Sequence, residues 1–175
     1  YGIPAYRLPR AELEREIDWI VSQGIELRMN TTVPNDVTLT QLREDFDAVY
    51  IAIGAHNEKT LGIEGETCEG VLSAVEMLRA IGDGFMHDFA GQRIVVVGGG
   101  NVAMDVARTS LRLGAACVTV VYRRRIEDMT AQHEEIEGAI AEGCEIMELA
   151  APLRIREEHG CVTGLEVQPQ VIGAF

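Results

Sequence analysis

The stretch Arg93-Ile-Val-Val-Val-Gly-Gly-Gly-Asn-Val-Ala-Met-Asp105 decides the fold of this chain. It has the pattern of an apolar β-branched strand, a glycine turn and the start of a helix. Gly98, Gly100 and Ala103 fit G-x-G-x-x-A, in which one glycine makes the turn, the next lets the backbone approach a phosphate, and a small residue lets the helix pack on the strand. The helix N-terminus would offer unpaired N–H groups to the anion. The stretch therefore predicts an α/β fold that binds a dinucleotide.

The next strand indicates which dinucleotide is bound. Residues 117–122 form a hydrophobic, β-branched run. NAD-binding folds usually place an acid at the end of this strand, where it accepts from the ribose 2′-OH. This chain has Arg123, Arg124 and Arg125 instead. Because guanidinium groups bind a 2′-phosphate through forked, charge-assisted hydrogen bonds, the sequence favours NADP(H).

Two alternatives to this interpretation stay open. The three arginines could be a solvated basic cluster with no ligand. Glu127 and Asp128 follow closely and could curl back to hydrogen-bond a ribose, which keeps NAD(H) as a candidate coenzyme.

Composition and charge exclude several classes of function. The formal net charge is −13, which argues against nucleic acid and anionic membrane surfaces as partners. No apolar run is long enough for membrane insertion. The four cysteines, at positions 68, 117, 144 and 161, form no C-x-x-C pair and no metal or iron–sulfur spacing. We therefore expect reduced thiols, a cytoplasmic protein, no metal site and no catalytic triad.

The whole chain reads as an α/β protein with parallel strands and flanking helices. Helices are expected over residues 10–23, from Thr38, and over 73–81, 101–113 and 131–141. Strands are expected over residues 25–30, 47–54, 93–97, 117–122 and 144–149, followed by a hairpin over 153–167. The residues from Gly98 onward are about half of the roughly 150 that a two-halved dinucleotide domain needs. We expect the adenosine half here and much of the nicotinamide half beyond the C-terminus.

Several motifs in fixed order carry a resemblance to a known family. They are Tyr1-Gly-Ile-Pro-Ala-Tyr-Arg-Leu-Pro-Arg10, Asp47-Ala-Val-Tyr-Ile-Ala-Ile-Gly-Ala55, Gly70-Val-Leu-Ser-Ala74, Val97-Gly-Gly-Gly-Asn-Val-Ala-Met-Asp105 and Tyr122-Arg-Arg124. With them the chain resembles the small (beta) subunits of NADPH-dependent glutamate synthase and related FAD/NAD(P)-binding oxidoreductases, such as the flavin portion of dihydropyrimidine dehydrogenase. The resemblance covers nearly the whole chain.

The resemblance implies two nested Rossmann-like domains, with an FAD domain interrupted by an NADPH domain. Residues 1–65 would be part of the FAD domain, 66–90 a crossing segment with one helix, and 91–175 the NAD(P)-binding domain. Hydride would pass from NADPH to FAD, and electrons would go on to iron–sulfur clusters and a partner such as a glutamate synthase large subunit. The FAD fingerprint and the cluster-binding cysteines of the family would lie upstream of Tyr1, so the FAD site in this chain is incomplete.

The resemblance also assigns binding residues. The pyrophosphate would lie on Gly98, Gly99, Gly100, Asn101 and Val102, and the 2′-phosphate on Arg123 and Arg124. Arg125 lies outside the two-residue match and is a weaker candidate, and Val33 and Gly54 would lie near the flavin. Thr130 stands where many relatives carry Pro after Met.

Other classes of function are weighed against an electron-input flavoprotein. One is a nucleotide-binding or interaction module without turnover, and another is the same redox role with NADH. A flavin disulfide reductase would need a C-x-x-C pair, which this sequence lacks. The sequence does not name the final electron acceptor.

Overall fold

The structure, a computed structural model, describes residues 2–57 and 59–173, which divide into two compact units. One unit is Ala5–His56, and the other contains the described residues from Asn57 onward together with residues 2–4. None of the helices in these ranges has the length and apolar character that crossing a bilayer requires.

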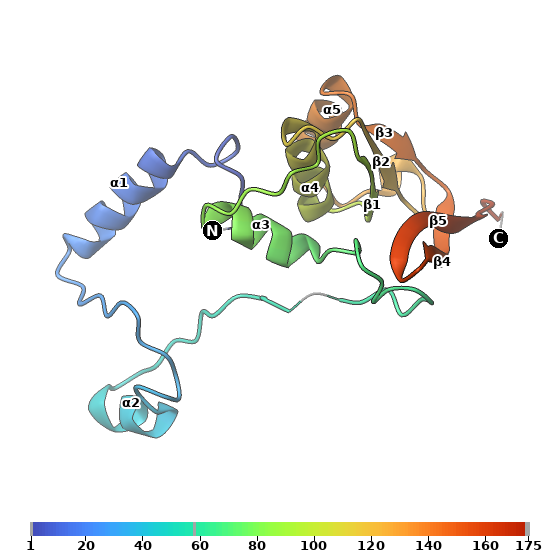
Figure 1. Ribbon diagram of the computed structural model, residues 1–175. Coiled ribbons are helices and arrows are strands. Elements are labelled where there is room, and N and C mark those ends of the chain that lie inside the picture. Colours follow the sequence, from blue (N-terminus) through green and yellow to red (C-terminus); the bar gives the residue numbers. More distant parts are fainter. Residues whose placement is uncertain (1, 58, 174–175) are drawn as a thin grey trace. The chain divides into compact units, whose positions relative to one another are not determined.

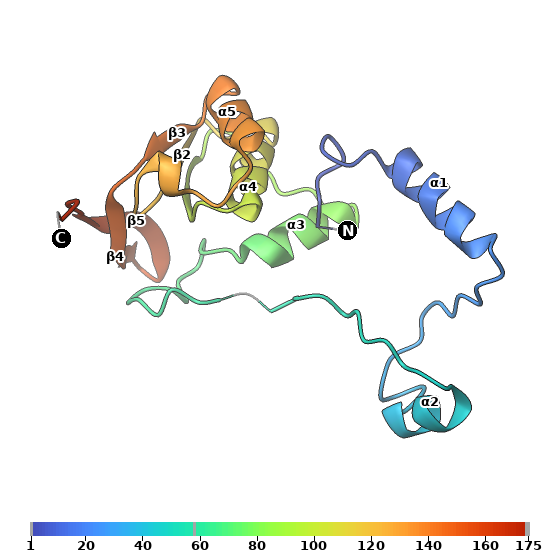
Figure 2. The same cartoon turned by 180° about the vertical axis from the view of Figure 1, so that it is seen from behind.

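A three-stranded parallel sheet forms the centre of the larger unit (Figures 1 and 2). Its strands are β1 (Arg93–Val97), β2 (Cys117–Val121) and β3 (Glu145–Met147), in the spatial order β1-β2-β3. The last residues of the three strands lie in register, so the strands end together at one edge of the sheet. The predicted parallel α/β architecture is therefore confirmed, and loops at this carboxyl edge are where such sheets bind ligands.

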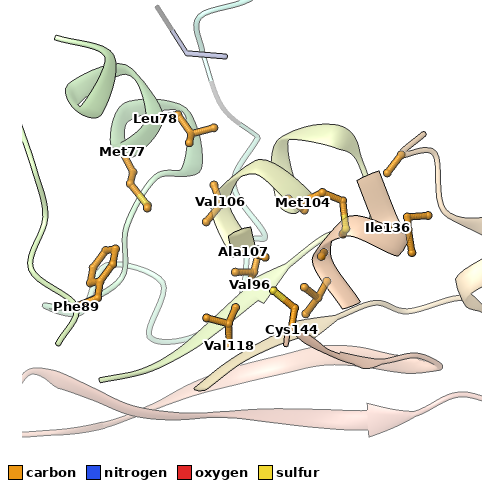
Figure 3. Packing of buried hydrophobic residues seen from close by; sticks show 14 residues of the cluster. Met77, Leu78, Phe89, Val96, Met104, Val106, Ala107, Val118, Ile136 and Cys144 are labelled. Atoms are coloured by element: carbon orange, nitrogen blue, oxygen red, sulfur yellow. The ribbon is translucent and has the colours of Figure 1, made fainter. Parts of the chain in front are cut away.

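Two helices connect these strands and lie on the same face of the sheet. They are α4 (Asn101–Arg112) and α5 (His133–Ala141), which also pack against each other. Both crossovers place their helix on one face because parallel connections are right-handed. Figure 3 shows the apolar side chains that fill the layer between sheet and helices, which include Val96, Met104, Ala107, Val118, Ile136 and Cys144. This core holds β1 and α4, and hence the turn between them, in a fixed geometry.

An ion-pair cluster joins the two helices at their surface. Glu142 lies just after α5 and accepts from Arg108 at 2.7 Å and from Arg112 at 2.8 Å, both from α4. Hydrogen bonds from Arg112 and Arg108 lower the pKa of the Glu142 carboxyl to about 2. Gly138 lies against the Arg108 guanidinium, and a Cβ there would be 3.2 Å from it. The cluster therefore fixes the packing of α5 on α4 by charge as well as by apolar contact.

A third helix, α3 (Ala74–Gly82), packs on α4. The Ser73 hydroxyl caps it by accepting from the Glu76 N–H at 3.2 Å. Its buried residues Met77 and Leu78 point toward Val106 of α4 (Figure 3). The helix expected in the crossing segment is thus part of the core of the nucleotide-fold unit.

The predicted hairpin follows the sheet. It consists of β4 (Ala150–Glu158) and β5 (Cys161–Pro169), joined by a two-residue turn with positive φ at both residues. Residues 64–70 run beside it: Ile155 N–H donates to the Glu64 carbonyl at 2.8 Å, and Val162 N–H donates to the Glu69 carbonyl at 2.9 Å. The segment before α3 is therefore fixed to the hairpin by backbone hydrogen bonds.

The smaller unit contains two helices, α1 (Arg10–Val21) and α2 (Leu39–Asp45), both at predicted positions. Thr38 and Gln41 form a capping box at the start of α2. The strands expected over residues 25–30 and 47–54 were wrong, because no strand is assigned in the described part of this unit. A strand needs a neighbour that pairs with its backbone, and no described segment pairs with these two. Their apolar side chains are consequently exposed.

Candidate functional site

The turn between β1 and α4 begins with a glycine whose conformation excludes other residues. Gly98 has φ of +140°, which side chains rarely adopt, and its N–H donates to the Val121 carbonyl at 3.1 Å. A Cβ on Gly98 would lie 3.4 Å from Cβ of Ala103 in α4. Small residues at both positions thus allow the close approach of strand and helix that the sequence pattern predicts.

The second glycine, Gly99, faces the aromatic ring of Tyr122. A Cβ at this position would lie 2.6, 2.7 and 2.9 Å from three atoms of the ring, which is less than van der Waals contact allows. The Gly99 carbonyl accepts two hydrogen bonds, from Thr130 N–H at 2.9 Å and from Ala131 N–H at 3.0 Å. This position was predicted only through the family resemblance, and the structure gives it a packing role.

The third glycine, Gly100, is the N-cap of α4. It has extended backbone, and no side chain caps the helix there. A Cβ on Gly100 would be 3.6 Å from Thr130 Oγ1, which is ordinary contact, so local packing does not demand a glycine. The N–H groups of Asn101 and Val102, with the partial positive charge of a helix start, are thereby left open to an anion, whereas the Ala103 N–H donates to the Gly100 carbonyl at 3.0 Å. The donor set fits a pyrophosphate, and a bare glycine here allows one to approach the backbone.

Asn101 and Val102 begin α4 and complete the predicted cradle. Asn101 Oδ1 accepts from Gln132 N–H at 2.8 Å, so this oxygen is used within the protein. Val102 is about half exposed at the helix start. Residues 98–102 are therefore brought together at the carboxyl edge of the sheet, as the sequence predicts.

The three arginines after β2 have different environments. Arg123 is exposed and makes no ion pair or hydrogen bond with any other side chain in the described ranges. The Arg124 guanidinium carbon lies 6.0 Å from the centroid of the Tyr122 ring, a cation–π distance. Tyr122 thus has the glycine turn and Arg124 as neighbours.

The Arg125 guanidinium is paired with a carboxylate of the same chain. Its Nε and Nη2 each lie 3.1 Å from an oxygen of Asp128, which is the forked arrangement of a guanidinium on a carboxylate. Arg125 precedes a short 3-10 turn, Ile126–Asp128, whose last residue is Asp128; the sequence did not predict this turn. The hydrogen bond from Arg125 lowers the pKa of the Asp128 carboxyl. An acid three residues after an arginine was the available signal for this turn.

Residues 125–132, hereafter the strap, connect the arginines with the glycine turn. The strap is bonded to Gly99 through Thr130 and Ala131, and to Asn101 through Gln132. The Tyr122 hydroxyl donates to the Asp128 carbonyl at 2.8 Å. The glycine turn and the segment that follows the arginines therefore form one hydrogen-bonded assembly rather than two separate loops.

The flavin contacts implied by the resemblance lie in the smaller unit. Val33 is 45% exposed and Gly54 is also exposed, with φ of +69°. Both lie in backbone that belongs to no helix or strand. By itself this unit presents no built flavin site, and these two residues stay predictions.

Metal-ligating side chains and thiols form neither a cluster nor a disulfide among the described residues of the larger unit. No group of three or more metal-ligating side chains is present in the described ranges. Cys68, Cys117, Cys144 and Cys161 are all free thiols. The arrangement at the carboxyl edge can therefore bind and orient an anionic coenzyme, whereas redox chemistry would come from the coenzymes themselves.

The chain is similar to known proteins in sequence and in fold. Residues 8–169 match the family model described as pyridine nucleotide-disulphide oxidoreductase. The chain is 40% identical to the beta subunit of NADP(+)-dependent formate dehydrogenase of Moorella thermoacetica, covering 98% of this chain and 25% of that protein. It is 40% identical to the beta subunit of the NADPH-Fe(3+) oxidoreductase of Geobacter sulfurreducens, covering 98% and 26%. With the glutamate synthase [NADPH] small chain of Escherichia coli it shares 37% identity, covering 95% and 38%.

The chain thus spans about a quarter to two fifths of the length of these relatives. Among solved structures it is similar to FprA of Mycobacterium tuberculosis in complex with NADPH, with a TM-score of 0.58 and 21% identity over 81% of this chain and 52% of that one. This likeness supports the fold. The match over most of the sequence establishes that the chain belongs to the pyridine nucleotide-disulphide oxidoreductase family.

Proposed function

We propose that this chain is the coenzyme-binding part of a flavoprotein oxidoreductase that takes hydride from NADPH. The observation that carries the proposal is the uncapped N-terminus of α4 at a glycine turn, joined through the strap to the arginines after β2. This arrangement supplies donors for a pyrophosphate and cations for a 2′-phosphate. The relatives named for NADP(+) or NADPH support the choice of coenzyme.

Different residues of the site would bind different parts of the coenzyme. Gly98, Gly99 and Gly100 keep side chains away from the pyrophosphate, and the amides of Asn101 and Val102 face it. Arg123, with no competing partner in the described chain, binds the 2′-phosphate, and Arg124 assists from its place beside Tyr122. The bound coenzyme supplies a hydride from the nicotinamide ring. The protein contributes position and charge, which is the usual division in coenzyme-dependent redox enzymes.

The proposal extends to the flavin and to a partner. Residues 1–65 would belong to an FAD domain, 66–90 to the crossing segment and 91–175 to the NADPH domain. Val33 and Gly54 would lie near the flavin. Electrons would pass from FAD to an iron–sulfur partner, and the names of the relatives, which are beta subunits or small chains, support the presence of a partner subunit. Those relatives serve formate, Fe(3+) and glutamate chemistry by name, so the final acceptor is left unassigned.

The preference for a 2′-phosphate is tested by calorimetric titration of the chain with 2′,5′-ADP and with 5′-AMP. We expect saturable binding that is tighter for 2′,5′-ADP. Arg123→Ala and Arg124→Ala should each weaken 2′,5′-ADP binding, by about 1.5–3 kcal/mol for a lost charged hydrogen bond. Arg79→Ala, at an exposed arginine of α3, is the matched control and should leave binding unchanged. Equal affinity for the two nucleotides would refute the NADPH assignment.

A further inference from the structure

Arg125 faces a carboxylate at the place where an acid would change coenzyme preference. Besides the forked contact with the Asp128 carboxylate, its Nε lies 3.7 Å from Oε2 of Glu127. The backbone reinforces the pair, because Arg125 N–H also approaches Asp128 Oδ2 at 3.3 Å and Asp128 N–H donates to the Arg125 carbonyl at 3.0 Å. The guanidinium is therefore already occupied by an acid of its own strap.

The position of Asp128 makes its charge important. The Tyr122 hydroxyl holds the Asp128 carbonyl, and the ring of the same tyrosine lies beside Gly99 and Arg124. Asp128 thus belongs to the assembly that borders both phosphate sites. A carboxylate after the second strand accepts from a ribose 2′-OH and repels a 2′-phosphate. An unpaired Asp128 would accordingly oppose the selection made by Arg123 and Arg124.

We propose that Arg125 determines coenzyme selectivity as a positioning residue: it neutralises and holds Asp128 and does not itself bind the 2′-phosphate. This inference rests on the proposed NADPH function and deepens it. Of the three arginines, Arg123 and Arg124 would bind the 2′-phosphate, and Arg125 would pair with the Asp128 carboxylate. Glu127 and Asp128 also acquire a role, since these acids coexist with a 2′-phosphate only while a cation faces them.

The test is a double-mutant cycle read as the ratio of affinities for 2′,5′-ADP and 5′-AMP. Arg125→Ala should lower this ratio by about tenfold. This value lies between the Coulomb energies of two unit charges about 4 Å apart in bulk water and near a protein surface. Asp128→Asn alone should leave the ratio unchanged or raise it. The decisive variant is Arg125→Ala with Asp128→Asn, for which we expect a ratio within about twofold of the wild type because no carboxylate is left to neutralise.

A direct phosphate contact by Arg125 predicts a different result. In that case the double variant would bind 2′,5′-ADP as weakly as Arg125→Ala does, and the proposal would be overturned. A ratio that is unchanged in Arg125→Ala would overturn it as well. General damage to the strap would weaken both nucleotides equally and leave the ratio at its wild-type value, so it counts against the proposal too.

A matched pair elsewhere controls for the loss of an arginine and an acid. Arg79 and Asp83 of α3 and its C-cap form an exposed pair at 3.9 Å, and Arg79→Ala with Asp83→Asn should leave the ratio untouched. Different outcomes of these titrations would refute the proposed function and this inference. Equal wild-type binding of the two nucleotides would remove the coenzyme preference itself, whereas a wild-type preference that survives Arg125→Ala would remove only the role of Arg125.

Discussion

Replacing Gly99 by alanine should destabilise the nucleotide-fold unit through a single methyl group. The added Cβ would lie 2.6–2.9 Å from three atoms of the Tyr122 ring. Ordinary carbon–carbon contact is about 3.5–4.0 Å, so ring or backbone must move by about 1 Å. The ring has little freedom to move, because its residue is 9% exposed and its hydroxyl is bonded to Asp128.

The free-energy change follows from these contacts. Overpacking a tight site by one methyl costs about 1–3 kcal/mol. Displacing the ring also breaks the Tyr122–Asp128 hydrogen bond, worth about 1 kcal/mol. We therefore expect the Gly99→Ala variant to be less stable by about 2–4 kcal/mol, a large share of the 5–15 kcal/mol of a typical domain.

Amide hydrogen exchange of β2 measures this effect where it arises. This strand pairs with β1 on one side and β3 on the other, so its amides exchange when the unit opens. A loss of 2–4 kcal/mol corresponds to exchange that is faster by about 30- to 1,000-fold. The single tryptophan, Trp19, lies in the other unit.

Gly100→Ala is the matched control for this prediction. Its Cβ would meet Thr130 Oγ1 at 3.6 Å, so the exchange rate of β2 should rise by less than about tenfold, which is the modest cost of alanine at an N-cap. Binding of 2′,5′-ADP should nevertheless fall, because the methyl occupies the approach to the pyrophosphate donors. Equal exchange rates in the two variants would contradict the assignment of Gly99 to packing and of Gly100 to the ligand.

Two further changes test the strap and the helix pair. Thr130→Pro removes the N–H that donates to the Gly99 carbonyl, but the Ala131 N–H still donates to that carbonyl. Urea unfolding followed by circular dichroism should therefore show a free energy of unfolding that is lower by no more than about 1 kcal/mol. A larger loss would show that the Thr130 hydrogen bond alone holds the strap. Glu142→Gln should lower stability by about 2–3 kcal/mol at pH 7, because hydrogen bonds from Arg112 and Arg108 hold the Glu142 pKa near 2, below its unfolded value. That contribution is present above the unfolded value of 4.5 and is lost as the pH falls toward 2, so the unfolding curves of wild type and variant should converge in acid. A constant difference across this range would contradict the assignment.

Local signals in the sequence were sufficient for the parallel sheet and its helices. The stretch from Arg93 to Asp105 contains its own strand, turn and helix start, and the strand after α4 is equally self-contained. The strands expected over residues 25–30 and 47–54 were wrong for the opposite reason. Their apolar pattern fits a buried strand, but a strand forms only beside another strand that pairs with its backbone. No described segment pairs with these two.

The site was predictable as a set of residues but not as an assembly. Glycine spacing located the turn, and the position after β2 located the arginines. The contact between Gly99 and Tyr122 joins residues far apart in sequence, and no periodicity encodes it. The commitment of Arg125 to Asp128 depends on a short 3-10 turn whose register only the backbone reveals.

The buried cysteine beneath the two helices gives the unit a native reporter of opening. Cys144 is 4% exposed, and burial raises the pKa of its thiol to about 11. Alkylating reagents attack the thiolate, so this sulfur stays unreactive while α5 covers the sheet and becomes reactive when the layer separates. A nucleotide that binds only the closed form protects it in proportion to its occupancy. The labelling rate of Cys144 would thus measure nucleotide affinity without an added fluorophore, at a residue that precedes β3 and lies at the edge of the sheet opposite the glycine turn.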